Sequence, residues 1–186
     1  MHKNYFLIFI VLVLFLSSCS VPHSSSSRYD RKDWPHWSDF NKNCLNTRSE
    51  ILKDRSISKI KLNKKGCKVK SGTWDDYYYP ERLQHVKEVD IDHLVPLKHA
   101  HDHGASHWSR KIKEDFANDP DNLVITHRKY NRAKGPKGID EWLPLNLEYA
   151  CKYVKDWIRI KSKYGLTVGS KEKITINELK GKCSQF

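Results

Sequence analysis

The sequence predicts a small α+β domain that is mainly helical and stapled by disulfide bonds. Its 186 residues suit one domain with a core of its own. Strand character is confined to short runs: HVKEVDID at 85–92 alternates between polar and apolar residues, and LVIT at 123–126 is a second short apolar run. A longer segment, NLEYACKYVKDWIRIKSKYG at 146–165, has apolar residues at helical spacing. Short strands followed by packing helices indicate the α+β class.

The strand over 85–92 is the best-defined of the expected elements. Val89 and Ile91 fall on one face of it and Asp90 and Asp92 on the other, because successive side chains of a strand alternate. The strand ends at a cluster of histidines. The other expected elements follow in chain order: a helix over 43–56, a short strand into a glycine turn over 67–74, and a short helix closed by an Asn-Asp-Pro turn over 109–122. Two helical turns over 127–135 stop at Gly135 and Pro136, and a last helix is expected over 170–183.

Residues 1–18 are expected to be an export signal. They carry one lysine, an apolar stretch too short to span a bilayer comfortably, and then small residues. The segment LSSC at 16–19 resembles a bacterial lipobox, in which cleavage before Cys19 leaves this cysteine as a lipid-bearing N-terminus. The alternative is ordinary secretion without lipid. Residues 19–38 contain a serine run and predict a flexible tether, so the folded body is expected over 39–186.

The net charge points to a polyanionic partner. Lysine and arginine number 34 against 22 aspartates and glutamates, which gives a formal charge of +12. Nucleic acid and an anionic lipid surface are the leading candidates for such a partner. The alternative is a basic protein with no such ligand, so charge alone does not decide.

The cysteine count agrees with export. If Cys19 carries lipid, an even set of four cysteines is left, which suits two disulfides in an oxidising compartment. None has the CxxC spacing of a zinc site. Among the three connectivities, proximity in the sequence favours the pairs Cys44 with Cys67 and Cys151 with Cys183.

The segment EVDIDHLVPLKHAHDHGASHW at 88–108 concentrates acids and histidines. Asp92 and His93 end the expected strand and precede LVP, whereas Asp102 and His103 lie in a polar stretch. The first pair is therefore the candidate for chemistry. Four other histidines are expected at solvated surface positions: His99, His101, His103 and His107. The alternative for them is weak adventitious metal binding.

Three segments together carry a family resemblance: DIDHLVPLKHA at 90–100, FANDPDNLVIT at 116–126 and YNRAKGPKGIDEWLP at 130–144. In this order and spacing they closely resemble the HNH endonucleases, in particular the secreted group similar to the C-terminal nuclease domain of GmrSD-type restriction enzymes. The resemblance extends from NTRSEIL and SGTWDDYY to the last cysteine. It implies a ββα-metal finger embedded in the helical domain.

The resemblance also implies roles for individual residues. His93 is similar to the first histidine of the HNH triple and would be the general base. Asn122 is similar to the central asparagine of the triple. Asn131 stands at the final histidine position, and Asp92 would be the metal ligand just before the base. Gly135 stands one helical turn further on, where zinc-binding relatives offer another histidine, which argues against a closed zinc site.

The chemistry of phosphodiester hydrolysis supports the same assignment. It needs a base to activate water, a cation to neutralise developing charge, and fixed geometry between them. Asp92 and the Asn131 amide offer hard oxygens, which suit Mg²⁺ or Mn²⁺. The alternative is that His127 joins as a nitrogen ligand and shifts preference to Zn²⁺, Ni²⁺ or Co²⁺. If His93 titrates near its reference pKa of about 6.5, activity should rise through that pH.

Supporting roles are expected around these residues. The Asn122 side chain could clamp the loop that orients His93; the alternative is an asparagine that only fills a turn. Glu141 and Trp142 are expected to be structural. Five basic residues are expected to contact phosphates: Arg128, Lys129, Arg132, Lys134 and Lys137. The alternative is that they form a solvated helix face.

These observations predict an exported, lipid-anchored, metal-dependent endonuclease that cuts DNA, or RNA, with low sequence specificity. No base-reading module is evident in the sequence. The competing hypothesis is a non-catalytic envelope lipoprotein that binds DNA or anionic surfaces through its charge.

Overall fold

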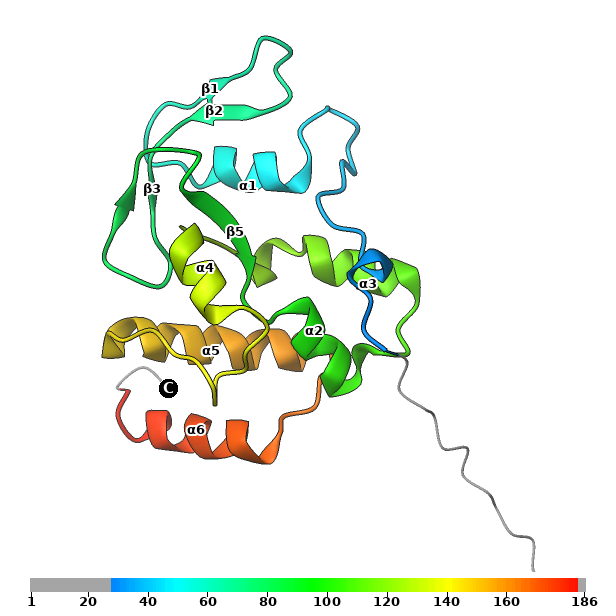
Figure 1. The fold of residues 1–186 in the computed structure, drawn as a ribbon, viewed down its shortest axis with the longest axis vertical. Coiled ribbons are helices and arrows are strands. Elements are labelled where there is room, and N and C mark those ends of the chain that lie inside the picture. Colours follow the sequence, from blue (N-terminus) through cyan, green and yellow to red (C-terminus); the bar gives the residue numbers. More distant parts are fainter. Residues whose placement is uncertain (1–27, 184–186) are drawn as a thin grey trace, which may run out of the picture.

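The computed structural model describes residues 28–183, and Figure 1 shows their arrangement. Three two-stranded antiparallel sheets and a set of helices make up this part of the chain. In chain order the elements are η1 (Arg31–Asp33), α1 (Thr47–Asp54), β1 (Lys61–Leu62), β2 (Val69–Ser71), β3 (Trp74–Asp75), β4 (Arg82–Leu83), β5 (Val89–His93), α2 (Leu97–Ala100), the π-helical η2 (His101–Ala105), α3 (Arg110–Asn118), η3 (Pro120–Asn122), β6 (Leu123–His127), α4 (Arg128–Lys134), α5 (Leu147–Lys163) and α6 (Ser170–Lys180). The expected mixture of short strands and helices is confirmed.

Strands β5 and β6 pair antiparallel along their whole length, from Val89 opposite His127 to His93 opposite Leu123. The segment between them holds α2, η2, α3 and η3. Helix α4 follows β6 without a loop and packs against both strands. The structure therefore contains a strand, a long connection, a strand and a helix, in the order that the sequence predicts.

Two hydrophobic clusters hold this unit in place. The first contains most of the buried aromatic residues and packs around α5, where Tyr153 and Trp157 have no exposed surface. The second lies between α1 and the β5–β6 pair and includes Leu52, Trp74 and Val89. Val89 and Ile91 of β5 belong to the second cluster, and Leu94 and Val95 directly after β5 belong to the first, so the end of β5 has a defined position.

Two disulfides staple the domain, with the pairing that sequence proximity favours. Cys44 and Cys67 join the segment before α1 to the β1–β2 hairpin, with their Cα atoms 5.0 Å apart. Cys151 in α5 is bonded to Cys183 after α6. The prediction of two intramolecular disulfides is confirmed.

The folded body begins earlier than the expected boundary at Asp39. Trp34 is only 1% exposed and packs edge-on against Phe116 with ring centroids 5.8 Å apart. The Ser38 amide donates to the Asn118 side chain at 2.9 Å. The part of the expected tether between Arg28 and Ser38 is thus packed on the domain, because a tryptophan in it completes the main core. The export signal and Cys19 lie outside the described residues.

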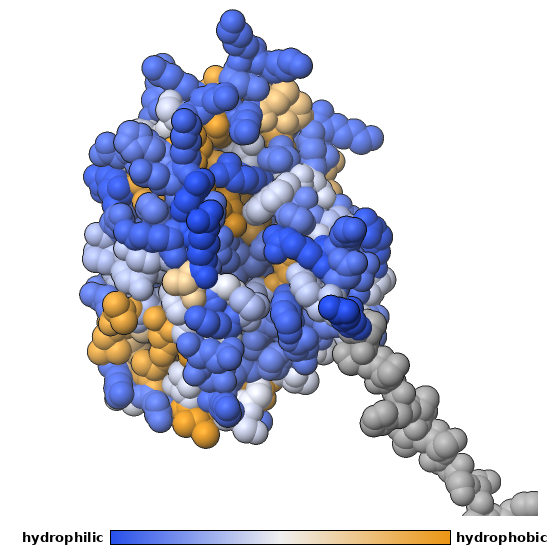
Figure 2. All heavy atoms as spheres, in the orientation of Figure 1, coloured by the Kyte–Doolittle hydropathy of each residue, from blue (hydrophilic) through white to orange (hydrophobic). Residues whose placement is uncertain are grey.

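The surface is largely hydrophilic on the face drawn in Figure 2, in keeping with the excess of lysine and arginine. Apolar side chains gather at its lower left. Leu147 of α5 and Ile174 of α6 are among the exposed large hydrophobic residues. Within residues 28–183, no helix combines the length and the apolar character needed to cross a bilayer.

Candidate active site

A pocket of about 370 Å³ lies where the end of β5, the start of α2, α4 and the N-terminal segment meet. Asp92, His93 and Asn131, which the sequence analysis singled out for chemistry, all line it. Asp92 and His93 come from the last two positions of β5, and Asn131 from the middle of α4. The packing of α4 against β5 and β6 brings Asn131 close to Asp92 and His93, which lie far from it in the sequence.

His93 is held as a neutral imidazole. Its Nε2 lies 2.8 Å from the carbonyl oxygen of Ala117, and because a carbonyl only accepts, Nε2 carries the proton. Nδ1 is then the nitrogen with a free lone pair. Burial lowers the pKa of His93 to about 3, the Ala117 hydrogen bond opposes this shift, and the positive charge of Arg31 adds to it. His93 is 6% exposed, and the ring of Trp37 lies 5.9 Å away.

Asp92 presents its two carboxylate oxygens differently. Oδ2 accepts a hydrogen bond from the Tyr78 hydroxyl at 2.6 Å and an ion pair from Lys134 Nζ at 2.8 Å. Among the described residues no donor contacts Oδ1. One oxygen therefore fixes the carboxylate and the other is left for a ligand.

Lys134 has no exposed surface, so it cannot meet the phosphates of a nucleic acid as the sequence analysis expected. Its ammonium donates to the backbone carbonyl of His93 at 2.9 Å as well as pairing with Asp92. Burial lowers the pKa of Lys134, and the Asp92 carboxylate opposes that shift. The residue that looked like part of a basic helix face is instead a buried support for the end of β5.

Asn122 clamps the loop that follows His93. It has no exposed surface, its side-chain oxygen accepts from the Val95 amide at 2.9 Å, and its side-chain nitrogen donates to the Val95 carbonyl at 3.3 Å. The backbone carbonyl of Asn122 accepts from the Leu94 amide at 2.7 Å. These contacts fix the backbone of the two residues that follow His93.

Asn131 is half-buried and oriented by an acid that the sequence analysis left without a role. Its side-chain nitrogen donates to the Asp90 carboxylate at 3.2 Å, and this assignment turns the amide oxygen away from Asp90. Helix α4 ends after Lys134 because Gly135 takes a positive φ of 56°. Gly135 lines the pocket and offers no side-chain ligand.

The position of His127 argues against the nitrogen-ligand alternative. Its Nδ1 accepts a hydrogen bond from the Lys129 amide at 3.0 Å and so caps the start of α4. A neutral imidazole that accepts at Nδ1 carries its proton on Nε2, which leaves no lone pair for a metal. His127 is also absent from the residues that line the pocket.

The other basic residues on α4 and directly after it differ in their partners and in their exposure to solvent. Lys129 is ion-paired with Glu81 at 3.3 Å and Lys137 donates to the Ala133 carbonyl at 2.9 Å. Arg132 is exposed, and Arg128 is half-buried. Trp142 packs edge-on against Tyr78, as the structural role predicted for it requires.

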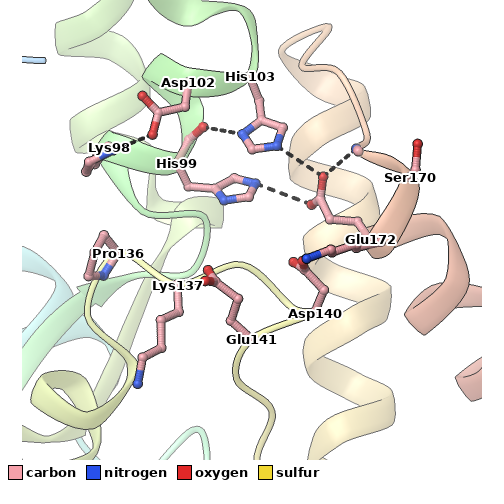
Figure 3. A pocket seen from close by; sticks show the side chains of 12 residues that line it. Lys98, His99, Asp102, His103, Pro136, Lys137, Asp140, Glu141, Ser170 and Glu172 are labelled. Carbon is pink, nitrogen blue, oxygen red and sulfur yellow. Dashed lines mark hydrogen bonds and ion pairs between the residues drawn. The ribbon is translucent and has the colours of Figure 1, made fainter. Parts of the chain in front are cut away.

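A second cluster contains histidines that were expected on the surface. His99 and His101 are buried, at 6% and 3% exposure, because α2 and η2 pack inward, whereas His107 is exposed as expected. Figure 3 shows His99 and His103 stacked, with both rings directed at Glu172 of α6. The distances from the two Nε2 atoms to the carboxylate oxygens are 3.3 and 3.5 Å.

This His-His-Glu group has the composition of a metal site, with ligand atoms within 4.8 Å of one another. However, the buried ammonium of Lys161 lies 2.8 Å from both oxygens of Glu172 and 3.2 Å from His99 Nε2. Although burial raises the pKa of Glu172, hydrogen bonds from His99 and Lys161 hold it well below its usual range. A cation already balances this carboxylate, so the group is a self-contained ion-pair network that ties α6 to α5 and α2.

Nothing in the sequence assigned a role to four further residues that line the pocket or hold its side chains. Tyr29 and Arg31 line it from the N-terminal segment. Tyr78 and Asp90 hold Asp92 and Asn131. Tyr78 lies in the tyrosine-rich run DDYYYP, and nothing in that run distinguishes the tyrosine that turns inward.

Comparison with known proteins shows which family this chain resembles. Residues 37–178 match the family described as GmrSD restriction endonucleases, C-terminal domain. A protein of Arthroderma benhamiae named "Uncharacterized secreted protein" is 34% identical over 164 residues, which cover 87% of this chain and 79% of that protein. No solved structure matches. The chain therefore belongs to the family of GmrSD restriction endonuclease C-terminal domains.

Proposed function

We propose that the protein is a metal-dependent endonuclease that hydrolyses DNA, and secondarily RNA, with low sequence specificity. The observation that carries this proposal is the meeting of a neutral histidine, a carboxylate and an amide in one pocket at the end of a β-hairpin. In this proposal β5, β6 and α4 form the ββα-metal finger of an HNH nuclease. The family supports a nuclease, and the pocket chemistry supports the class of reaction.

His93 is the general base of the proposed reaction. Its tautomer leaves Nδ1 to take a proton from the attacking water, and the Ala117 carbonyl stabilises the positive charge that then forms on the ring. The buried surroundings keep the ring unprotonated at neutral pH, as a general base requires. Asn122 contributes by fixing the loop directly after His93.

Asp92 and Asn131 are the proposed metal ligands, through the free Asp92 Oδ1 and the amide oxygen. Both are hard oxygens, which fit Mg²⁺ or Mn²⁺ better than the alternatives Zn²⁺, Ni²⁺ and Co²⁺. When bound, such a cation neutralises charge on the phosphate and its leaving oxygen. The ammonium of Lys134 competes for the same carboxylate, so we expect weak binding that EDTA reverses easily.

Exposed arginines and lysines near α4 are the proposed phosphate contacts outside the pocket. Arg132 and Lys137 are exposed and Arg128 is half-buried, whereas Lys129 must first leave Glu81. Such contacts fix the duplex without reading its sequence. This supports cleavage of low specificity.

We also propose the route to the site of action. Residues 1–18 would be the export signal, Cys19 the lipid-bearing residue, and the residues that follow a tether to the folded body. Mass spectrometry of the mature N-terminus tests this, and Cys19→Ser should release the protein from membranes without changing the melting temperature. An unmodified N-terminus at another residue would contradict lipidation.

The nuclease proposal is tested with the purified mature chain and supercoiled plasmid, with EDTA and then with added Mg²⁺ or Mn²⁺. His93→Ala should lower the cleavage rate by about 10² to 10⁴ fold, while DNA affinity changes little because the surface cations are intact. His107→Ala, at an exposed histidine, is the matched control and should cut at the parental rate. A parental protein that binds plasmid but never cuts it with any divalent metal would establish a binding protein instead.

A further inference from the structure

The N-terminal segment from Tyr29 to Trp37 is built into the wall of the pocket. Trp34 anchors it in the core between Phe116 and Trp108, whose ring centroids lie 5.8 and 6.1 Å away. The turn η1 begins with Asp30, whose carboxylate accepts from the Lys32 amide at 2.9 Å. The segment is thus held by packing and by its own cap.

The anchor places Tyr29 and Arg31 on the pocket that also contains Asp92 and His93. Tyr29 packs edge-on against the buried ring of His101 with centroids 5.5 Å apart. The charge of Arg31 acts on the His93 imidazole, whose pKa it lowers in addition to the larger effect of burial. Arg31 is therefore close enough to the base for its charge to be felt there.

Two cations line the pocket, and they differ in their partners. Lys98 is ion-paired with Asp102 at 2.5 Å. Arg31 makes no ion pair with any acid of residues 28–183. The guanidinium is exposed on the turn and its charge is left for a ligand from outside. A planar guanidinium offers paired N–H donors that match two oxygens of one phosphate.

We propose that Arg31 binds the non-bridging oxygens of the phosphodiester that is cleaved. This inference rests on the proposed nuclease function and extends it to a segment that the family match, which begins at residue 37, does not include. Arg31 holds the phosphate beside His93 and Asp92 and stabilises the negative charge that grows on it as water attacks. Because one wall of the site comes from the N-terminal segment and the others from β5, α2, α4 and the residues after it, the segment before residue 37 is part of the enzyme.

Binding is tested without catalysis. The probe is inorganic phosphate, titrated in EDTA while the imidazole signals of His93 are followed by NMR. The parental protein and Lys32→Ala should show the same phosphate-dependent shift, and Arg31→Ala should lose it. Lys32 is the matched control because it is exposed on the same turn, carries the same charge and does not line the pocket. A parental His93 signal that ignores phosphate, or an unchanged response in Arg31→Ala, overturns the proposal.

Cleavage gives a second readout with metal present. Arg31→Ala should reduce kcat/KM for plasmid and for a small diester by about 10 to 10³ fold, Arg31→Lys should recover part of the loss, and Lys32→Ala should stay within about twofold. Equal rates for Arg31→Ala and the parental protein would remove Arg31 from the site and leave the nuclease function standing. A parental protein that does not cut would instead refute the nuclease function, while the phosphate titration still decides whether Arg31 binds phosphate.

Discussion

The Lys134 ammonium and the Asp92 carboxylate form a buried ion pair with 2.8 Å between Nζ and Oδ2, behind the pocket that also holds His93. Lys134 has no exposed surface and Asp92 is 7% exposed. The same ammonium donates to the His93 carbonyl, so one side chain of α4 fixes both residues at the end of β5.

Removing the lysine should therefore be costly. We expect Lys134→Met to lower the free energy of unfolding by about 3 to 5 kcal/mol, because a buried carboxylate is left without its charge partner. Urea unfolding followed by fluorescence measures this change. Lys137→Met, at an exposed lysine on the next turn of chain, should change stability by no more than about 0.5 kcal/mol.

A double variant checks the reason for that loss. Asp92→Asn combined with Lys134→Met removes both charges, so it should be less destabilised than Lys134→Met alone. A double variant that is less stable than either single variant would contradict a charge-pair origin. Its cleavage rate should nevertheless be low, since Asp92 is a proposed metal ligand.

The pH dependence of stability should report His93. Its unfolded pKa is about 6.5, and its folded pKa is about 3, so between these values the unfolded state binds more protons. The stability that this group contributes is therefore complete above about pH 6.5 and is lost as the pH falls toward 3. Urea unfolding at several pH values should show a shallower acid slope for His93→Gln than for the parental protein.

The cleavage rate should lack the pH-dependent step that an ordinary histidine predicts. The sequence alone suggested that activity rises near pH 6.5 as His93 loses a proton. With the pKa of His93 lowered by burial to about 3, the base is already deprotonated at pH 5, and kcat/KM should have no His93-dependent step between pH 5 and 7. A step in this range that His93→Gln abolishes would show that the imidazole is more solvated than its contacts indicate.

Patterns within single elements were enough to predict the framework. The alternation in HVKEVDID and the helical spacing after Asn146 depend only on local geometry, and both elements are present. The disulfides were predictable because each joins cysteines close in sequence, with separations of 23 and 32 residues. The meeting of Asp92, His93 and Asn131 followed from the family resemblance and not from periodicity.

Three features that the sequence did not predict depend on packing between residues far apart in the chain. Lys134 lies on the same helix as the exposed Lys129 and Arg132, and its ion pair with the buried Asp92 accounts for its place in the core. His99 is buried because Glu172 and Lys161, both far along the chain, form its polar surroundings. Trp34 stands in a polar stretch whose composition is typical of a tether, yet one aromatic side chain docks the segment.

Metal removal should abolish cleavage reversibly. Asn131→Ala removes one proposed oxygen ligand, so we expect a lower metal affinity and partial recovery of its rate at high Mn²⁺. Asn131→Asp adds a charge and should lower the Mn²⁺ concentration that gives half-maximal rate. His103→Ala is the control from the His-His-Glu group and should leave this concentration unchanged, since Lys161 already balances that carboxylate. A metal requirement that follows His103 instead of Asn131 would move the metal to that group.

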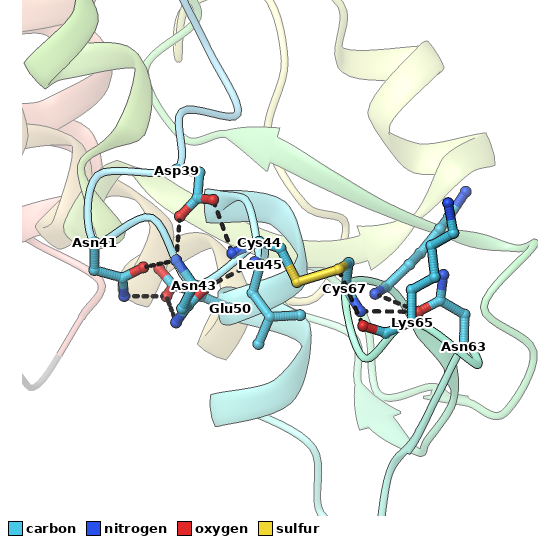
Figure 4. The surroundings of a disulfide bond; sticks show 10 residues. Asp39, Asn41, Asn43, Cys44, Leu45, Glu50, Asn63, Lys65 and Cys67 are labelled. Carbon is cyan, nitrogen blue, oxygen red and sulfur yellow. Dashed lines mark hydrogen bonds between the residues drawn. A yellow bond between two sulfur atoms is a disulfide. The ribbon is translucent and has the colours of Figure 1, made fainter.

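The disulfide between Cys44 and Cys67 should stabilise the region beside β5. Figure 4 shows hydrogen-bonded loops on both sides of it: the Asp39 carboxylate accepts from the Cys44 amide, and the Asn63 side chain from the Cys67 amide. Replacing both cysteines by serine should lower the free energy of unfolding by about 2 to 4 kcal/mol. Non-reducing mass mapping checks the bond, and an unchanged unfolding midpoint in the double serine variant would contradict the expected contribution.

A substitution of Asn122 can separate an effect on the position of His93 from an effect on the stability of the fold. Asn122→Ala leaves the amide and the carbonyl of Val95 without their side-chain partners in a fully buried place, which should cost about 2 to 6 kcal/mol at about 1 to 3 kcal/mol for each group. Because Val95 lies two residues after His93, the rate at saturating substrate should fall as well, under conditions where the variant is still folded. Hydrogen exchange at the Val95 amide should accelerate more than exchange in α5, which would show that the loop loosens locally.

The matched control is Asn177→Ala, at an exposed asparagine of α6, which should change neither the cleavage rate nor the hydrogen exchange at Val95. If Asn122→Ala cuts at the parental rate with Val95 still protected, the clamp does not position the base, and the buried asparagine serves the fold alone.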